Sequence, residues 1–166
     1  MTRWCKRLAI ACAAALLGPV APAAFGATAT STFTATITIT ATCQVISANT
    51  LSFGTQGLLT ANIDASSTFV VYCTNGTTYN VGLDDGTTTG GTITTRLLIN
   101  GATTVQYKMF SNSGRTTNWG NTVGTDTVAG TGTGANQTMT IYGRVLSQTT
   151  PAPGTYTDTV TITITY

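Results

Sequence analysis

The sequence predicts an all-β protein, and the arrangement it favours is an antiparallel β-sandwich with immunoglobulin-like architecture. Threonine alternates with apolar residues over long stretches, as in residues 33–43 (FTATITITATC) and 159–166 (TVTITITY). Such alternation is typical of strands with one buried face. Turn-forming residues separate the apolar stretches, and nothing after residue 26 has a convincing helical period. A barrel is the alternative architecture, and the unequal lengths of the predicted strands argue against it.

Short strands are predicted wherever β-branched and aromatic residues lie between turn signals. In order, they are residues 31–45, 49–53, 67–73, 78–83, 92–98, 104–111, 138–145 and 154–166. The glycine-rich stretch 130–134 (GTGTG) superficially resembles a phosphate-binding loop, but such a loop requires a helix after it. Because a predicted strand follows instead, we interpret the stretch as a flexible loop.

The last and the first predicted strands have the clearest two-faced pattern. In the last strand, threonines occupy one face and the apolar face is formed by Tyr156, Val160, Ile162, Ile164 and Tyr166. Asp158 interrupts that face, and we expect its carboxylate to lie at the rim or to accept hydrogen bonds from turn amides. In the first strand, the apolar face is formed by Phe33, Ala35, Ile37, Ile39 and Ala41. Both strands are therefore predicted to be half-buried.

A secretory signal peptide is predicted over residues 1–26. Arg3, Lys6 and Arg7 form its basic region, residues 8–17 form its apolar region, and small residues precede a cleavage site after about Gly26. The whole sequence has seven basic and five acidic residues, so loss of these three basic residues leaves a mature net charge of −1. A slightly acidic protein has no electrostatic footprint for nucleic acid, and we predict no such partner.

Cysteine use also indicates an exported protein. Cys43 and Cys73 remain after cleavage, and an even pair in an exported chain predicts one disulfide. A metal site is the competing interpretation, but the chain has no histidine and too few other ligands. We predict no metal and no cofactor.

Nothing in the sequence predicts catalysis, and the chain is predicted not to be an enzyme. It has no histidine, and the mature chain has no spacing that suggests a serine–base or cysteine–base pair. Asp84 and Asp85 are adjacent, so they would point to opposite faces of a strand, and they are better explained as turn formers.

Sugar binding is a more serious hypothesis, because aromatic side chains can stack on sugar rings. The candidates are Tyr72, Tyr79, Tyr107, Tyr142 and Trp119. The tyrosines lie within strand patterns, where core or interface positions are the simpler interpretation. Trp119 lies in a polar segment. It could be a loop anchor that packs onto the sandwich or an exposed contact, and the sequence leaves both possibilities open.

Several stretches are distinctive when taken together. They are TATCQVISANTLSFGT at 40–55, STFVVYCTNGTTYNVGLDDG at 67–86, GRTTNWGN at 114–121, GTGTGANQTMTIYGRV at 130–145 and PAPGTYTDTVTITITY at 151–166. These stretches resemble the spore coat protein U family, which includes the Csu-type major pilins of the archaic chaperone–usher pathway. The resemblance covers essentially the whole mature chain. The family is bacterial, so the resemblance implies export to the periplasm and assembly at an outer-membrane usher.

The resemblance implies an immunoglobulin-like fold whose final strand is missing. A periplasmic chaperone would fill the resulting groove first, and the N-terminal extension of an identical or related pilin subunit would replace it by donor-strand complementation. Carried over to this chain, residues 27–42 form the donor extension and residues 43–166 the pilin domain. Phe33, Ile37 and Ile39 would be the larger plugs, with Ala35 and Ala41 the smaller ones, and Cys43–Cys73 would match the family's bridge.

The terminal strand would line the groove, and its end would dock the chaperone. The expected function is therefore that of a structural subunit of cell-surface fimbriae, exported through the periplasm, that supports adhesion and biofilm formation. Two alternatives remain. One is a self-complemented spore-coat or surface structural protein, in which residues 33–41 fill the groove of their own chain, and the other is a sugar-binding adhesin module.

Overall fold

The computed structural model describes residues 25–166, and these residues form strands, turns and loops. The predicted signal peptide lies outside the described residues except at its last positions. Residues 38–166 form one unit, and the described residues before it, 25–37, have no regular secondary structure. No helix with the length and hydrophobicity needed to cross a membrane occurs among the described residues.

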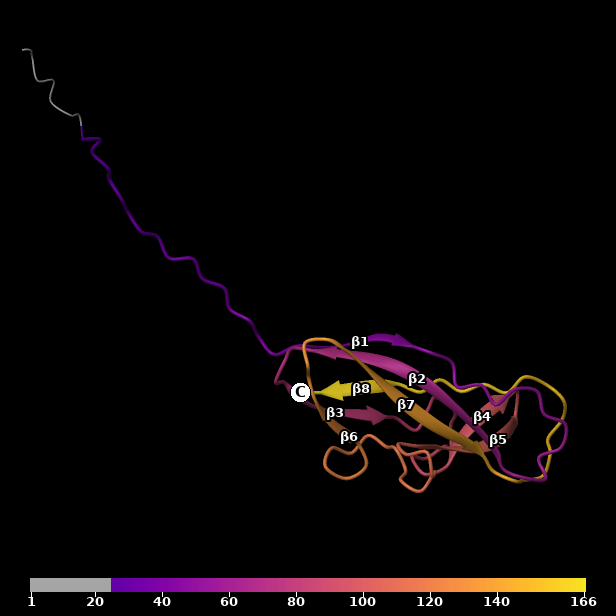
Figure 1. Cartoon of the computed structure of the whole chain (residues 1–166). Coiled ribbons are helices and arrows are strands. Elements are labelled where there is room, and N and C mark those ends of the chain that lie inside the picture. The colour runs from indigo at the N-terminus through magenta and orange to yellow at the C-terminus, as the bar shows by residue number, and fades with distance from the viewer. Residues whose placement is uncertain (1–24) are drawn as a thin grey trace, which may run out of the picture. The chain divides into compact units, whose positions relative to one another are not determined.

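Two antiparallel sheets make up the domain (Figure 1). The five-stranded sheet has the order β1-β2-β7-β5-β4, and the three-stranded sheet has the order β6-β3-β8. Strands of the first sheet are β1 (Cys43–Ala48), β2 (Ile63–Cys73), β7 (Asn136–Val145), β5 (Thr103–Phe110) and β4 (Arg96–Asn100). Strands of the second sheet are β6 (Val128–Thr131), β3 (Thr78–Leu83) and β8 (Ile162–Thr165). The predicted all-β fold, consistent with an immunoglobulin-like sandwich, is confirmed.

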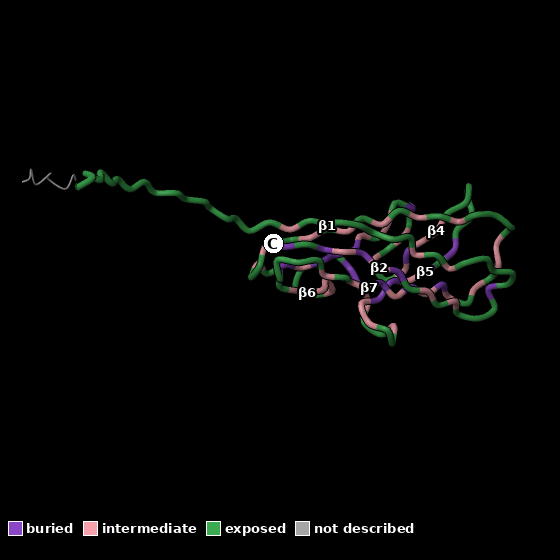
Figure 2. Tube along the Cα trace, turned by 45° about the horizontal axis from the view of Figure 1, so that its top comes forward, coloured by how far each residue is buried: buried purple, intermediate pink, exposed green. Residues whose placement is uncertain are grey.

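The apolar core lies where the inward-facing positions of the strands meet. In β2, Phe69 and Val71 have no exposed surface, whereas Val70 and Tyr72 between and beside them face outwards. Alternate residues of β3 join the same core cluster. Figure 2 shows the buried residues along these strands, while the described residues before β1 are exposed. Burial therefore follows the strand period that the sequence displays.

Trp119 is part of this core. Its side chain is 1% exposed, its ring centroid lies 5.8 Å from that of Phe69, and its Nε1 donates to the carbonyl of Val81 at 2.8 Å. Of the two interpretations that the sequence left open, the buried loop anchor is the one the structure shows.

Several predicted strand boundaries are wrong. β1 begins at Cys43 rather than at residue 31, residues 49–53 form no strand, and β8 covers only part of the predicted 154–166. A strand requires a hydrogen-bonded ladder as well as an alternating pattern, and the omitted stretches form no ladder with a strand of the described chain. The glycine-rich stretch 130–134 was predicted to be a loop, but it contains the end of β6, which pairs with β3.

The predicted disulfide between Cys43 and Cys73 is confirmed. The two residues lie directly opposite each other in the β1–β2 ladder, with Cα atoms 4.1 Å apart. Cys43 is the first residue of β1 and Cys73 the last of β2. Within residues 25–166, no group of three His, Cys, Asp or Glu side chains is placed to hold a metal ion.

Replacing Val71 with alanine should lower the free energy of unfolding by about 2 kcal/mol, because it removes buried methyl groups and leaves a cavity. Val70→Ala is the matched control on the outer face of the same strand, and it should cost less than about 1 kcal/mol. Urea unfolding measures both variants. Equal losses would contradict the assignment of the two faces.

Removal of the disulfide by Cys43→Ala together with Cys73→Ala should lower the free energy of unfolding by about 3–4 kcal/mol, because the unfolded chain regains the freedom of a 30-residue loop. Denaturant unfolding of the oxidised wild type and of the double variant provides the measurement. A loss below about 1 kcal/mol would show that the bond contributes little to stability.

Candidate functional site

Each sheet ends in a strand that has a partner on one side only, and two of these edge strands are neighbours. β8 ends the three-stranded sheet and pairs with β3, while β1 ends the five-stranded sheet and pairs with β2. β1 and β8 are in contact with each other across the sandwich. Edge strands of this kind present a row of main-chain N–H and C=O groups that can bind another strand.

The register of β8 identifies the main-chain groups on its open side. Thr161 accepts a hydrogen bond from the Asp84 amide at 3.1 Å, and residues 163 and 165 pair with β3. The odd-numbered residues therefore direct their main-chain groups towards β3. Alternate residues of a strand direct these groups to opposite sides. The open side consequently carries the N–H and C=O groups of Val160, Ile162 and Ile164, which we call the docking edge.

An apolar groove of about 1020 Å³ lies beside the segment that leads into β8. Residues 50–59, which follow β1, form one wall, and residues 150–158 form the other. Leu51 and Phe53 pack against Gly143 of β7, where a Cβ atom would stand 2.7 Å from Leu51 and 2.9 Å from Phe53. Glycine at this position therefore lets the two side chains settle onto the sheet and leaves the groove open above them.

The predicted groove residues do not all lie together. Tyr156 lines the groove, and Val160, Ile162 and Ile164 are half-buried against the core on the same face of the segment. Tyr166 is 59% exposed and lines a separate depression of about 560 Å³ with residues 39–41 and 74–78. The roles of these residues in docking stay predictions.

The predicted plug residues of the extension are exposed. The exposed fractions are 93% for Phe33, 84% for Ile37 and 69% for Ile39, and Ala35 and Ala41 are exposed as well. The segment that contains them has no strand partner among the described residues. Its role as a donor strand stays a prediction.

Thr74 holds the chain immediately before β1. Its amide donates to the carbonyl of Thr42 at 2.9 Å, and the Thr42 amide donates to Thr74 Oγ1 at 3.2 Å. The same hydroxyl donates to the carbonyl of Thr40 at 3.2 Å. The end of the extension is thus fixed to the domain at residues 40–42.

Sequence reasoning missed one wall of the site. Val45 is 39% exposed although it lies opposite the fully buried Val71, so its side chain faces the open side of the sandwich. Leu51 and Phe53, which line the groove, alternate with the polar Thr50 and Ser52. This short alternation was the available signal. It was interpreted only as strand propensity, because the position of the missing partner is not visible in the sequence.

Asp158 accepts hydrogen bonds from a turn, which is one of the two environments expected for it. Its Oδ1 accepts from the Thr87 amide at 3.0 Å and from the Thr159 amide at 2.9 Å. Its Oδ2 accepts from the hydroxyl of buried Tyr107 at 2.7 Å. The Asp158 carboxylate also occupies the space that a side chain on Gly86 would need, and φ of Gly86 is +85°. Glycine at that turn position is therefore required.

Asp84 plays a corresponding part beside β3. Its Oδ1 accepts from the Thr161 amide at 2.8 Å and from the Gly86 amide at 3.0 Å. The fully buried Arg96 fixes the same region, because its guanidinium donates to the carbonyls of Leu83, Asp84, Ile93 and Trp119 at 2.7–3.0 Å. Asp84, Asp158 and Arg96 thus belong to one polar network below the docking edge.

The environment shifts the pKa values of this network. Burial raises the pKa of Asp84, but the hydrogen bonds from Thr161 and Gly86 and the nearby Arg96 charge outweigh burial, so the pKa lies below its usual value. Burial and the hydrogen bond to Asp158 raise the pKa of the Tyr107 hydroxyl, which stays protonated and able to donate. Burial lowers the pKa of Arg96, and the neighbouring carboxylates act in the opposite direction.

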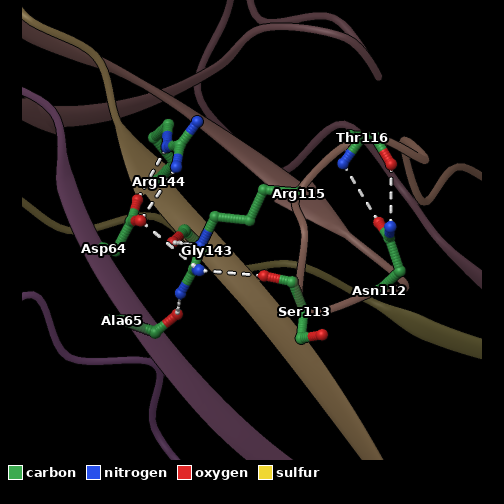
Figure 3. A network of polar contacts seen from close by, with 8 residues as sticks. All are labelled: Asp64, Ala65, Asn112, Ser113, Arg115, Thr116, Gly143 and Arg144. Atoms are coloured by element: carbon green, nitrogen blue, oxygen red, sulfur yellow. Dashed lines mark hydrogen bonds and ion pairs between the residues drawn. The ribbon is translucent and has the colours of Figure 1, made fainter.

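A second polar network lies on the outer face of β2 and β7 (Figure 3). Arg144 binds Asp64 through two hydrogen bonds of 2.7 and 2.8 Å, which lower the pKa of Asp64. Arg115, with φ of +53°, donates to the carbonyls of Ala65 and Gly143 at 3.1 Å and approaches Asp64 at 3.4 Å. These contacts fasten the connection between β5 and β6 to the sheet, and that connection continues to Trp119.

Asp84→Asn should change how stability depends on pH. A carboxyl group whose pKa is lowered by folding stabilises the fold above its unfolded pKa of about 3.9, and this contribution is lost as the pH falls through the lower folded value. The difference in unfolding free energy between wild type and variant should therefore be largest at pH 5–7 and shrink below about pH 4. Asp85→Asn, at an exposed neighbour, is the control. A difference independent of pH would contradict the role of the Asp84 charge.

Comparison with known proteins places this geometry in a family. No curated protein matches the chain. A solved structure that matches is the CsuC–CsuE chaperone–tip adhesion subunit pre-assembly complex of the archaic chaperone–usher Csu pili of Acinetobacter baumannii, with a TM-score of 0.56 and 24% identity over 78% of this chain. The chain covers 40% of the matched chain, and the likeness concerns the fold. The Spore Coat Protein U domain model matches residues 29–163, and the chain belongs to that family.

Proposed function

We propose that this chain is a structural pilus subunit that polymerises by donor-strand complementation. Residues 27–42 of one copy serve as the donor, and the domain 43–166 of another copy serves as the acceptor. The observation that carries the proposal is an open strand edge beside an apolar groove in a chain that also exposes an alternating apolar segment. An open strand edge with an apolar groove is unfavourable alone, and so is an exposed apolar segment. The segment can supply both the strand that the edge lacks and the apolar side chains that fill the groove.

The spacing of the donor places its large apolar side chains on one face of a strand. Phe33, Ile37 and Ile39 belong to the odd-numbered face of the extension, so all of them enter the groove when the intervening threonines face solvent. Burial of the three side chains would contribute about 1.5–3 kcal/mol each. The docking edge offers about six main-chain hydrogen bonds of about 0.5–1.5 kcal/mol each. Ordering of the extension opposes these gains.

A chaperone and an usher are the partners that assembly requires. Before a donor arrives, an open edge and an apolar groove favour aggregation, so a protein that covers them is needed. The matching structure described above is a complex of a chaperone with a pilus tip subunit, which supports the same kind of partner for this chain. The subunit would then pass through the periplasm and the outer-membrane usher into surface fimbriae that support adhesion and biofilm formation.

The burial of the aromatic residues favours a structural pilus subunit over a sugar-binding adhesin module. Tyr79, Tyr107 and Trp119 have at most 4% of their surface exposed and cannot stack on a ligand. Tyr142 is half-buried, and the Arg115 guanidinium lies 5.8 Å from its ring centroid. Tyr72 is the remaining candidate of the aromatic set, with 42% exposure, and one ring provides little for sugar recognition.

Ile39→Asp should abolish the SDS-resistant multimers of unheated samples, because a carboxylate cannot enter an apolar groove without a large desolvation penalty. Thr38→Asp is the matched control, since its side chain faces solvent in the docked strand, and it should retain the ladder. The readout is gel electrophoresis of fibres with and without boiling. A ladder that survives Ile39→Asp would overturn the assigned donor face.

Electron microscopy distinguishes the pilus subunit from the self-complemented alternative. The full chain is co-expressed with the chaperone and usher of its own host, and thin surface fibres are the expected result. A soluble monomer that forms neither fibres nor multimers would instead support a self-complemented surface protein, in which the extension fills the groove of its own chain.

A further inference from the structure

The segment that carries the docking edge changes from one sheet to the other. At one end, Thr157 exchanges two main-chain hydrogen bonds with Ile99 of β4, at 2.8 and 3.1 Å, and β4 belongs to the five-stranded sheet. At the other end, β8 pairs with β3 of the three-stranded sheet. The residues between these two attachments, 158–161, are bound to neither sheet by a complete ladder.

In residues 158–161, two carboxylates accept the hydrogen bonds that a neighbouring strand on the inner side would otherwise accept. Thr159 and Thr161 are the odd-numbered residues between the two attachments, so their amides point away from the open side. The Thr159 amide donates to Asp158 Oδ1 at 2.9 Å, and the Thr161 amide donates to Asp84 Oδ1 at 2.8 Å. We call Asp84 and Asp158, with these hydrogen bonds, the carboxylate brace.

Groups in the core hold the brace in place. Tyr107 of β5 donates to Asp158 Oδ2 at 2.7 Å, and the turn after β3 donates to both carboxylates through the amides of Gly86 and Thr87. Arg96 binds the main-chain carbonyl of Asp84 at 2.7 Å. The brace is therefore tied to both sheets and to the turn between β3 and β4.

We propose that Asp84 and Asp158 are positioning residues that hold the open segment in strand geometry before a second copy of this chain docks on it. The proposal rests on the proposed function. Within the segment the carboxylates accept only from the amides of Thr159 and Thr161, which face inwards, so the main-chain groups of Val160, Ile162 and Ile164 stay available to the incoming strand. An unbraced segment of this length would have to be ordered during docking, and ordering each residue opposes binding.

The test compares docking with stability in the full chain. The acceptor is the full chain carrying Ile37→Asp and Ile39→Asp, which prevent its own extension from docking. The probe is a fluorescent peptide of residues 29–42. Asp158→Ala and Asp84→Ala are introduced separately. Asp126→Ala is the control, because Asp126 Oδ1 also accepts a main-chain amide, that of Thr122 at 2.7 Å, in a loop that does not line the groove.

Loss of either brace residue should slow peptide uptake by about tenfold or more, the effect of losing a hydrogen bond to a charged group. Asp126→Ala should leave uptake within about twofold of that of the acceptor with both brace residues intact, even if it lowers the unfolding midpoint as much as the brace variants do. Asp158→Asn retains an acceptor oxygen and should recover part of the rate. Hydrogen exchange should show that the amides of Thr159 and Thr161 lose protection in the brace variants.

Each outcome decides a different point. Unchanged uptake in both alanine variants, or an equal loss in Asp126→Ala, would overturn the brace while leaving the proposed function intact. If the acceptor with both brace residues intact fails to take up the peptide, the proposed function and the inference that rests on it are overturned. If Asp158→Ala does not fold, Asp158→Asn and Tyr107→Phe replace it, and normal uptake in both would also overturn the brace.

Discussion

The main-chain groups of β8 that face away from β3 have no ladder within the described domain, and much of the structure is arranged around them. Unpaired N–H and C=O groups next to apolar surface are unfavourable, and a protein must cover them or use them. Here the side chains of the same residues are half-buried and apolar. An incoming strand can therefore satisfy the hydrogen bonds and the apolar surface together.

The rest of the site follows from keeping that edge open. Gly143 allows Leu51 and Phe53 to settle onto β7, which leaves room between residues 50–59 and 150–158. The carboxylates of Asp84 and Asp158 accept the inward amides, and buried Arg96 fixes the turn beside them. Asp158, which interrupts the apolar face of the last segment, is therefore explained by the main-chain amides that its carboxylate binds.

The sequence was most informative where the pattern and its partner both lie in the chain. Thr78–Leu83 was predicted with its observed bounds, and the Cys43–Cys73 pair was predicted correctly. The strands predicted over residues 31–42 and 154–161 do not form within the single chain, because alternation shows that a segment can be a strand but not that a neighbour is present. The groove wall at Leu51 and Phe53 was missed for the same reason. The register of a docked strand is also hidden, since a shift by two residues preserves the threonine alternation.

The position of the disulfide has a mechanical consequence. Cys43 is the first residue of β1 and follows directly on the extension, and its partner Cys73 ends β2, which lies between β1 and β7 in the sheet. A pull on the extension that breaks the hydrogen bonds between residues 40–42 and Thr74 would reach the domain at Cys43. The covalent bond would pass that tension straight to β2, so β1 could not be peeled from the sheet one hydrogen bond at a time.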